Sequence, residues 1–157
     1  MKNRFKEVFA TKKPVIAMVH LGALPGSLLH DSEAGLNGLI EAARLDLHAL
    51  QDAQVDAVMF GNENDRPYEL EVDTASTSAA AYIIGQLKSE INIPFGVNML
   101  WDPMATVALG ATTGATFVRE IFTGSYASDM GNWTADAGKA MCYRDQLNRK
   151  DMLMLFN

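Results

Sequence analysis

The sequence has little of three features that would assign it to a special class of protein. Cys142 is its one cysteine, so no disulfide forms within the chain, and a lone thiol fits a reducing compartment. Basic residues are not in excess, since 13 Lys and Arg stand against 19 Asp and Glu, which argues against a nucleic-acid partner. No apolar run approaches the ~20 residues of a membrane-spanning helix. These absences predict a cytoplasmic protein that neither binds nucleic acid nor spans a membrane.

The N-terminal segment, MKNRFKEVFATKK, lacks the apolar centre and the small-residue cleavage site of a signal peptide. Phe5, Val8 and Phe9 instead share one face of a helix. The sequence therefore predicts a short helix within residues 1–13 that leans on the rest of the domain.

Short apolar runs alternate with amphipathic stretches along the rest of the chain. The runs predict strands at residues 14–21, 55–60, 93–100, 115–124 and 151–157, and the stretches between them predict helices at 35–51, 74–91, 105–114 and 134–149. Strands that are apolar on both faces and separated by helices indicate a parallel α/β sheet with right-handed crossovers. No linker or low-complexity segment interrupts the pattern, so residues 1–157 are predicted to form a single domain.

Two architectures fit this pattern, an open doubly wound sheet and a (βα)8 barrel of the TIM type. The first strand is followed by GALPGS, which does not have the G-x-G-x-x-G spacing of a dinucleotide-binding sheet. Polar residues follow every strand, and in a barrel all these strand ends open on one mouth, so the barrel is preferred. A barrel has eight strands and this chain supplies the first five. Its free edges would continue in a longer chain or pair with another copy in a homo-oligomer.

Polar side chains appear abruptly at the carboxyl end of each predicted strand, as in VDAVMFGNENDRP (residues 55–67). A plain turn needs one or two such residues, whereas the same change recurs at five consecutive strand ends. Because the carboxyl ends of parallel strands meet at one edge of the sheet, this recurrence predicts a ligand site. The candidates in chain order are His20, Asn62, Glu63, Asn64, Asn98, Trp101, Asp102, Arg119, Glu120, Asp129 and Asn157.

Four of these candidates are predicted to be catalytic: His20, Glu63, Asp102 and Glu120. His20 is the type of side chain that titrates near neutral pH, although a histidine on an apolar strand is often a structural residue. Glu63 is a candidate general base or metal ligand, or else a partner of Arg66 that closes the loop. Asp102 precedes a proline, so capping of the next helix explains it equally well.

The other candidates are predicted to bind substrate. Arg119 and Glu120 are adjacent in a strand, so they are expected to face opposite sides of the sheet, with one of them lining the pocket. An inward Arg119 would suit a small anionic metabolite. Trp101 would stack on a sugar or base, or only pack. Asp129 lies in TGSYASDMGNW, which reads as a loop long enough to form a lid or simply as a solvated loop.

Several of these segments together resemble the BtpA/SgcQ family. They are PVIAMVHLGALPG, VDAVMFGNENDRPY, IPFGVNMLWDP, FVREIFTGSYASDMG and the terminal LFN, which follow one another from about residue 12 onward. The N-terminal segment is similar to that of the bacterial SgcQ branch. The resemblance implies a (βα)8 barrel of which this chain corresponds to the first part. One branch of the family is named for photosystem I accumulation, and the other is associated with operons for sugar uptake and metabolism.

Three functional interpretations remain open. The first is an enzyme on a phosphorylated, sugar-like substrate: an isomerase, epimerase or lyase in which His20 and Glu63 exchange protons and Asn98 and Arg119 hold oxyanions. No lysine stands at the five strand ends, which argues against a Schiff base, while a divalent metal is compatible with the His, Glu and Asp candidates. The second is a non-catalytic assembly or regulatory factor of the photosystem I type. The third is an inactive truncated product.

Overall fold

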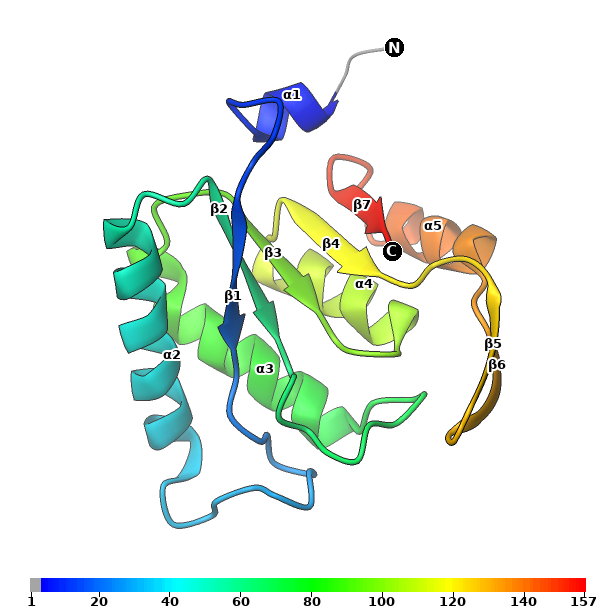
Figure 1. Cartoon of the computed structure of the whole chain (residues 1–157), viewed down its shortest axis with the longest axis horizontal. Helices are drawn as coiled ribbons and strands as arrows, with labels where there is room; N and C mark the ends of the chain where they lie inside the picture. The colour runs from blue at the N-terminus through cyan, green and yellow to red at the C-terminus, as the bar shows by residue number, and fades with distance from the viewer. Residues whose placement is uncertain (1–3) are drawn as a thin grey trace.

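The computed structural model describes residues 4–157 and shows one parallel sheet in the strand order β1-β2-β3-β4-β7 (Figure 1). The strands are β1 Ile16–His20, β2 Ala57–Gly61, β3 Phe95–Asn98, β4 Phe117–Glu120 and β7 Leu153–Phe156. All neighbouring pairs are parallel. The predicted parallel α/β sheet is therefore confirmed, while its closure into a barrel stays a prediction.

Helices cover one face of this sheet (Figure 1). They are α2 Gly35–Asp52, α3 Thr74–Leu87 with the 3-10 turn η1 Lys88–Glu90, α4 Pro103–Thr113 and α5 Ala137–Gln146. Their apolar sides and the strand residues between them form the main core, in which Leu47, Ile83 and Val97 are fully buried. None of the helices in residues 4–157 is both long and apolar enough to cross a membrane.

The opposite face of the sheet has a smaller apolar cluster, Phe9, Ala57, Met59 and Phe117. The helix α1, Arg4–Val8, lies at the amino end of the strands (Figure 1). Phe9, directly after it, packs on Phe117 with ring centroids 5.5 Å apart. The N-terminal helix is short, as the sequence predicts, and leans on the sheet; residues 1–3 lie outside the described part. Gly96 is required beside this cluster, because a Cβ there would come within 2.1 Å of the Phe117 ring.

The segment that reads as a loop after β4 is a β-hairpin. Its strands β5 Ser125–Ser128 and β6 Gly131–Thr134 pair in antiparallel fashion. The expectation of an irregular loop here is therefore wrong, and the next helix begins later than predicted, at Ala137. Asp136 caps that helix by accepting a hydrogen bond from the Lys139 amide at 2.9 Å.

The sheet has two open edges within the described chain, β1 and β7, each of which pairs with one neighbour only. Val15, just before β1, is 60% exposed, and Phe156, in β7, is 48% exposed. Both edges therefore present unpaired backbone groups and an apolar side chain together.

Candidate functional site

The carboxyl ends of the strands carry two neighbouring cavities that share Tyr68 and Leu100 as a wall. We name them the Glu120 pocket, about 230 Å³, and the Asp65 pocket, about 260 Å³. The predicted residues that line the Glu120 pocket are Glu63, Asn98, Trp101, Arg119, Glu120 and Asn157. The structure thus brings together candidates from the ends of β2, β3, β4 and β7.

Glu120 is the buried acid of the first pocket, with only 4% of its surface exposed. Its Oε1 accepts a hydrogen bond from the Trp101 amide at 2.8 Å, and its Oε2 accepts one from Asn98 Nδ2 at 2.5 Å. Burial raises the pKa of Glu120, and these donors and the positive charge of Arg119 act in the opposite direction. A carboxyl whose pKa is raised toward neutrality is suited to take and return a proton.

Arg119 lies beside Glu120 and is exposed. Its guanidinium donates to Asn157 Oδ1. Adjacent strand residues were expected to divide between the two faces, yet both line this pocket. Glu120 is the last residue of β4, so its side chain can reach the loop that follows β3. The expectation that only one of the pair lines the pocket is therefore wrong.

Asn98 is buried and uses its amide group within the protein. Nδ2 donates to the Arg119 carbonyl at 2.7 Å as well as to Glu120 Oε2. Because both donor hydrogens are engaged, Asn98 fixes the orientation of Glu120, which differs from the expected role of binding an oxyanion.

Tyr68 was not among the sequence candidates, although it lines both pockets. Its hydroxyl lies 2.9 Å from the Glu63 carbonyl oxygen and 3.2 Å from Glu63 Oε1, within donating distance of each. The signal in the sequence is its place directly after the polar NENDRP run, where a tyrosine adds a hydroxyl to the amides and charges.

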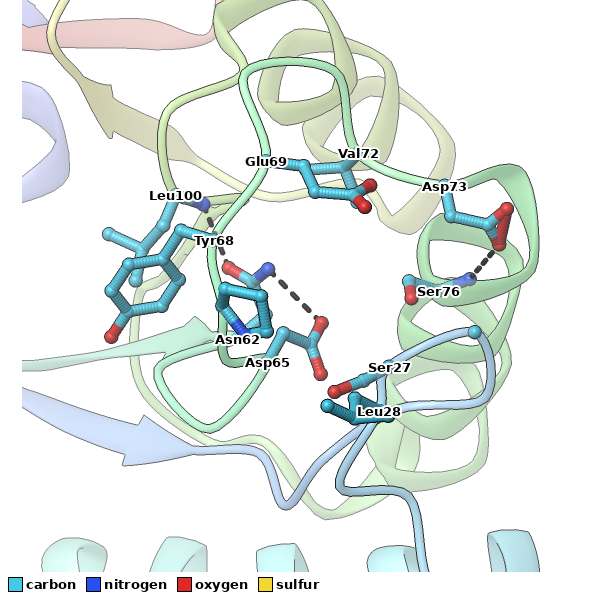
Figure 2. A pocket seen from close by; sticks show the side chains of 12 residues that line it. Ser27, Leu28, Asn62, Asp65, Tyr68, Glu69, Val72, Asp73, Ser76 and Leu100 are labelled. Atoms are coloured by element: carbon cyan, nitrogen blue, oxygen red, sulfur yellow. Dashed lines mark hydrogen bonds between the residues drawn. The ribbon is translucent and has the colours of Figure 1, made fainter. Parts of the chain in front are cut away.

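The Asp65 pocket lies between the loop after β1, the loop after β2 and the start of α3 (Figure 2). Asp65 is 8% exposed; its Oδ1 accepts from the Leu24 amide at 2.7 Å and its Oδ2 from Asn62 Nδ2 at 3.2 Å. Asn62 in turn accepts from the Leu100 amide at 2.8 Å, as Figure 2 shows. Burial raises the pKa of Asp65. Asn62, predicted to bind substrate, thus joins the loops after β2 and β3, and Asp65 joins them to the loop after β1.

The remaining candidates line neither pocket. His20 is exposed at the end of β1, and Asp129 is exposed in the turn of the hairpin. Asn64 donates to the Leu21 carbonyl at 2.7 Å. Asp102 caps α4 by accepting from the Met104 and Ala105 amides at 3.0 and 2.9 Å, which agrees with the capping alternative. In the described part of the chain, His20 and Glu63, which were expected to exchange protons with a substrate, therefore do not line the same cavity.

The His, Glu and Asp candidates are also compatible with a divalent metal. In residues 4–157 no three His, Cys, Asp or Glu side chains are grouped so that they could hold a metal ion. The described residues alone therefore do not assemble such a site, and use of a divalent metal stays a prediction.

Comparison with known proteins gives one family. The family model described as BtpA family matches residues 11–157. The sgc region protein SgcQ of Escherichia coli is 51% identical over 152 residues, which are 97% of this chain and 57% of that protein. The photosystem I biogenesis protein BtpA of Synechocystis is 33% identical over 145 residues, 90% of this chain and 50% of that protein. An uncharacterized protein of Thermococcus kodakarensis is 34% identical over 76% of this chain and 46% of its own length.

The chain spans about half the length of the curated relatives that it matches. No solved structure matches the chain.

Proposed function

The chain belongs to the BtpA family, and from this premise we propose that it acts on a small phosphorylated, sugar-like metabolite by acid/base chemistry of the isomerase, epimerase or lyase type. One observation carries the proposal: a buried carboxyl, Glu120, is fixed by two donors beside an exposed cation, Arg119, in a pocket at the carboxyl end of the sheet. The relatives are about twice as long, so the proposal concerns the part of the fold that this chain supplies and is tested on this chain.

Glu120 is the proposed base. It would take a proton from the carbon next to a sugar carbonyl and return it to the same or the neighbouring carbon, which gives epimerisation or isomerisation. Arg119 would bind the phosphate through charge-assisted hydrogen bonds, with Asn157 orienting its guanidinium. Glu63 and the Tyr68 hydroxyl, which are 3.2 Å apart, would exchange the proton on the carbonyl oxygen.

Solvent deuterium exchange tests this proposal directly. The chain is incubated in D2O with aldose and ketose phosphates from triose to hexose, and proton NMR follows the hydrogen on the carbon next to the carbonyl. Loss of that signal for at least one compound is expected. Binding of these compounds without any exchange would reject acid/base chemistry, and absence of binding to all of them would reject the substrate class.

A non-catalytic assembly role is the second candidate, and the open edges of the sheet support it. Val15 and Phe156 add exposed apolar side chains to the unpaired backbone of β1 and β7. A protein that joins others through such edges would form defined complexes. Light scattering measures this: a chain that stays monomeric at high concentration would remove this support.

A further inference from the structure

Trp101 lines the Glu120 pocket, and its ring contacts that of Trp133, the other tryptophan of the chain. Their ring centroids are 5.8 Å apart and the rings are nearly perpendicular, at 82°. Tyr126 stacks on Trp133 at 5.8 Å and 30°. We call Trp101, Tyr126 and Trp133 the aromatic cluster. Trp101 follows β3, whereas the other two lie on the β5–β6 hairpin, so this contact links the hairpin to a residue that lines the pocket.

The aromatic cluster belongs to neither hydrophobic core. The main core and the smaller cluster under α1 contain none of its three residues. Trp133 is half-buried and Tyr126 is 42% exposed, on a hairpin whose strands are otherwise exposed. Large aromatic surface that is kept at the rim of a polar cavity, outside any core, is typical of a ligand-contacting surface.

The backbone of Trp101 supports the same interpretation. Its φ is +68°, a left-handed conformation that is rare for a bulky residue. The conformation is held by Glu120, which accepts the Trp101 N–H at 2.8 Å. Strained residues persist where the surrounding structure determines them, and they concentrate at functional sites. The buried acid and the indole at the pocket rim are thus fixed relative to each other.

We propose that the aromatic cluster is a stacking surface for the ring of a cyclic sugar phosphate, with the hairpin residue Trp133 as its specificity determinant; this rests on the proposed function. The C–H face of a pyranose ring is apolar and would lie against the indoles. Its hydroxyls would find acceptors in Glu63 and Glu120, and its phosphate would reach Arg119. An open-chain polyol phosphate offers the same polar groups but no ring face.

Calorimetric titration of three probes tests the proposal: glucose 6-phosphate, its open-chain analogue glucitol 6-phosphate, and adenosine 5′-monophosphate. The wild-type chain is expected to bind glucose 6-phosphate about 10-fold more tightly than glucitol 6-phosphate. Trp133→Ala is expected to remove this preference, and Trp133→Phe to restore part of it. Tyr82→Ala on α3, which removes another exposed aromatic ring far along the chain, serves as the matched control and should keep the preference.

The outcomes separate this inference from the proposed function. Near-UV circular dichroism and urea unfolding first establish that Trp133→Ala is folded. Glucose 6-phosphate binding that needs Arg119 but keeps its ring preference in Trp133→Ala would overturn the stacking surface and leave the proposed function intact. Tighter, Trp133-dependent binding of adenosine monophosphate would replace the sugar ring by a base and overturn the inference. Binding of none of the three probes would overturn the inference, whereas the deuterium-exchange test with the full series of sugar phosphates decides on the proposed function.

Discussion

Two buried carboxylates at the carboxyl end of the sheet are held in the same way, yet they lie in different surroundings. Asp65 and Glu120 each accept one backbone N–H and one asparagine side-chain amide, and burial raises the pKa of each. The donors of Asp65 come from the loops after β1 and β2. Those of Glu120 come from β3 and the loop after it. Each acid therefore joins neighbouring strand ends.

The difference lies in what else faces each cavity. The described residues that line the Asp65 pocket include Glu69 and Asp73 but no Lys or Arg, so an anion would be repelled there. The Glu120 pocket contains Arg119, whose guanidinium is exposed and whose partner, Asn157, is neutral. The same pair of hydrogen bonds thus joins loops at Asp65 and leaves an acid beside an exposed cation at Glu120.

The largest effect expected from this difference is on catalysis. Glu120→Gln keeps the shape of the side chain but cannot take a proton, so the deuterium-exchange rate should fall about 10²- to 10⁴-fold. Asp65→Asn is the matched change in the other pocket and should leave the rate near that of the wild type. NMR exchange rates under identical conditions measure both. Equal losses in the two variants would mean that the two acids do not differ in function.

The next effect is on stability, and here Asp65 is the sensitive residue. Asp65→Ala leaves the Leu24 amide and the Asn62 side chain buried without their acceptor. Such orphaned donors cost about 1–3 kcal/mol each, so we expect the free energy of unfolding to fall by about 2–6 kcal/mol. Asp73→Ala, which removes an exposed helix cap, should cost about 1 kcal/mol. Urea unfolding compares them, and similar losses would contradict a structural role for Asp65.

A smaller effect is expected on anion binding. Arg119→Met removes the cation of the Glu120 pocket and should weaken glucose 6-phosphate binding about 10-fold, without loss of stability because Arg119 is exposed. Lys150→Met makes the same change of charge before β7, at the opposite end of that strand from Asn157, and its side chain is 72% exposed. Calorimetry measures both variants. Equal weakening would show that net charge, rather than the pocket, attracts the anion.

Much of this architecture is predictable because it depends on burial patterns. Apolar runs gave the five parallel strands to within a few residues, and β1, predicted at 14–21, is observed at Ile16–His20. The β5–β6 hairpin is not predictable in this way, because its strands lack such a burial pattern. Every residue of β5 is exposed, so it has no alternation of buried and exposed positions to reveal a strand.

The location of the candidate site was predictable from the sequence, whereas the side chains that line it were only partly predictable. Parallel strands bring their carboxyl ends together whatever their detailed geometry, so the location of Asn98, Arg119 and Glu120 followed from strand order. Which side chains face a cavity depends on loop conformations that local sequence does not determine. His20 therefore lies outside both pockets, and the meeting of Trp101 with Trp133 depended on the unpredicted hairpin.

The smallest expected effect is on the pH dependence of stability. Because burial raises the pKa of Asp65 and Glu120, the native chain holds protons that the unfolded chain has released just above the ordinary values of 3.8 and 4.5. Stability should therefore decrease as the pH rises from those values through the raised native pKa values. The hydrogen bond from Arg44 lowers the pKa of Glu90, and that from Arg149 lowers the pKa of Asp151, so their contributions are lost as the pH falls below the ordinary values.

Urea unfolding of the wild type and of Glu120→Gln across this range isolates one acid from the rest. The unfolding free energy of the wild type minus that of Glu120→Gln should decrease as the pH rises above 4.5, the ordinary pKa of the group. Above the raised native pKa of Glu120 this difference should level off. Titrations common to both proteins, including those of Glu90 and Asp151, cancel in this difference. For Asp65→Asn the corresponding difference should also decrease, beginning at pH 3.8, the ordinary pKa of that group. A constant difference for Glu120→Gln would mean that its hydrogen-bond donors and Arg119 fully offset its burial, and the acid would then lack the raised pKa on which its proposed role as base depends.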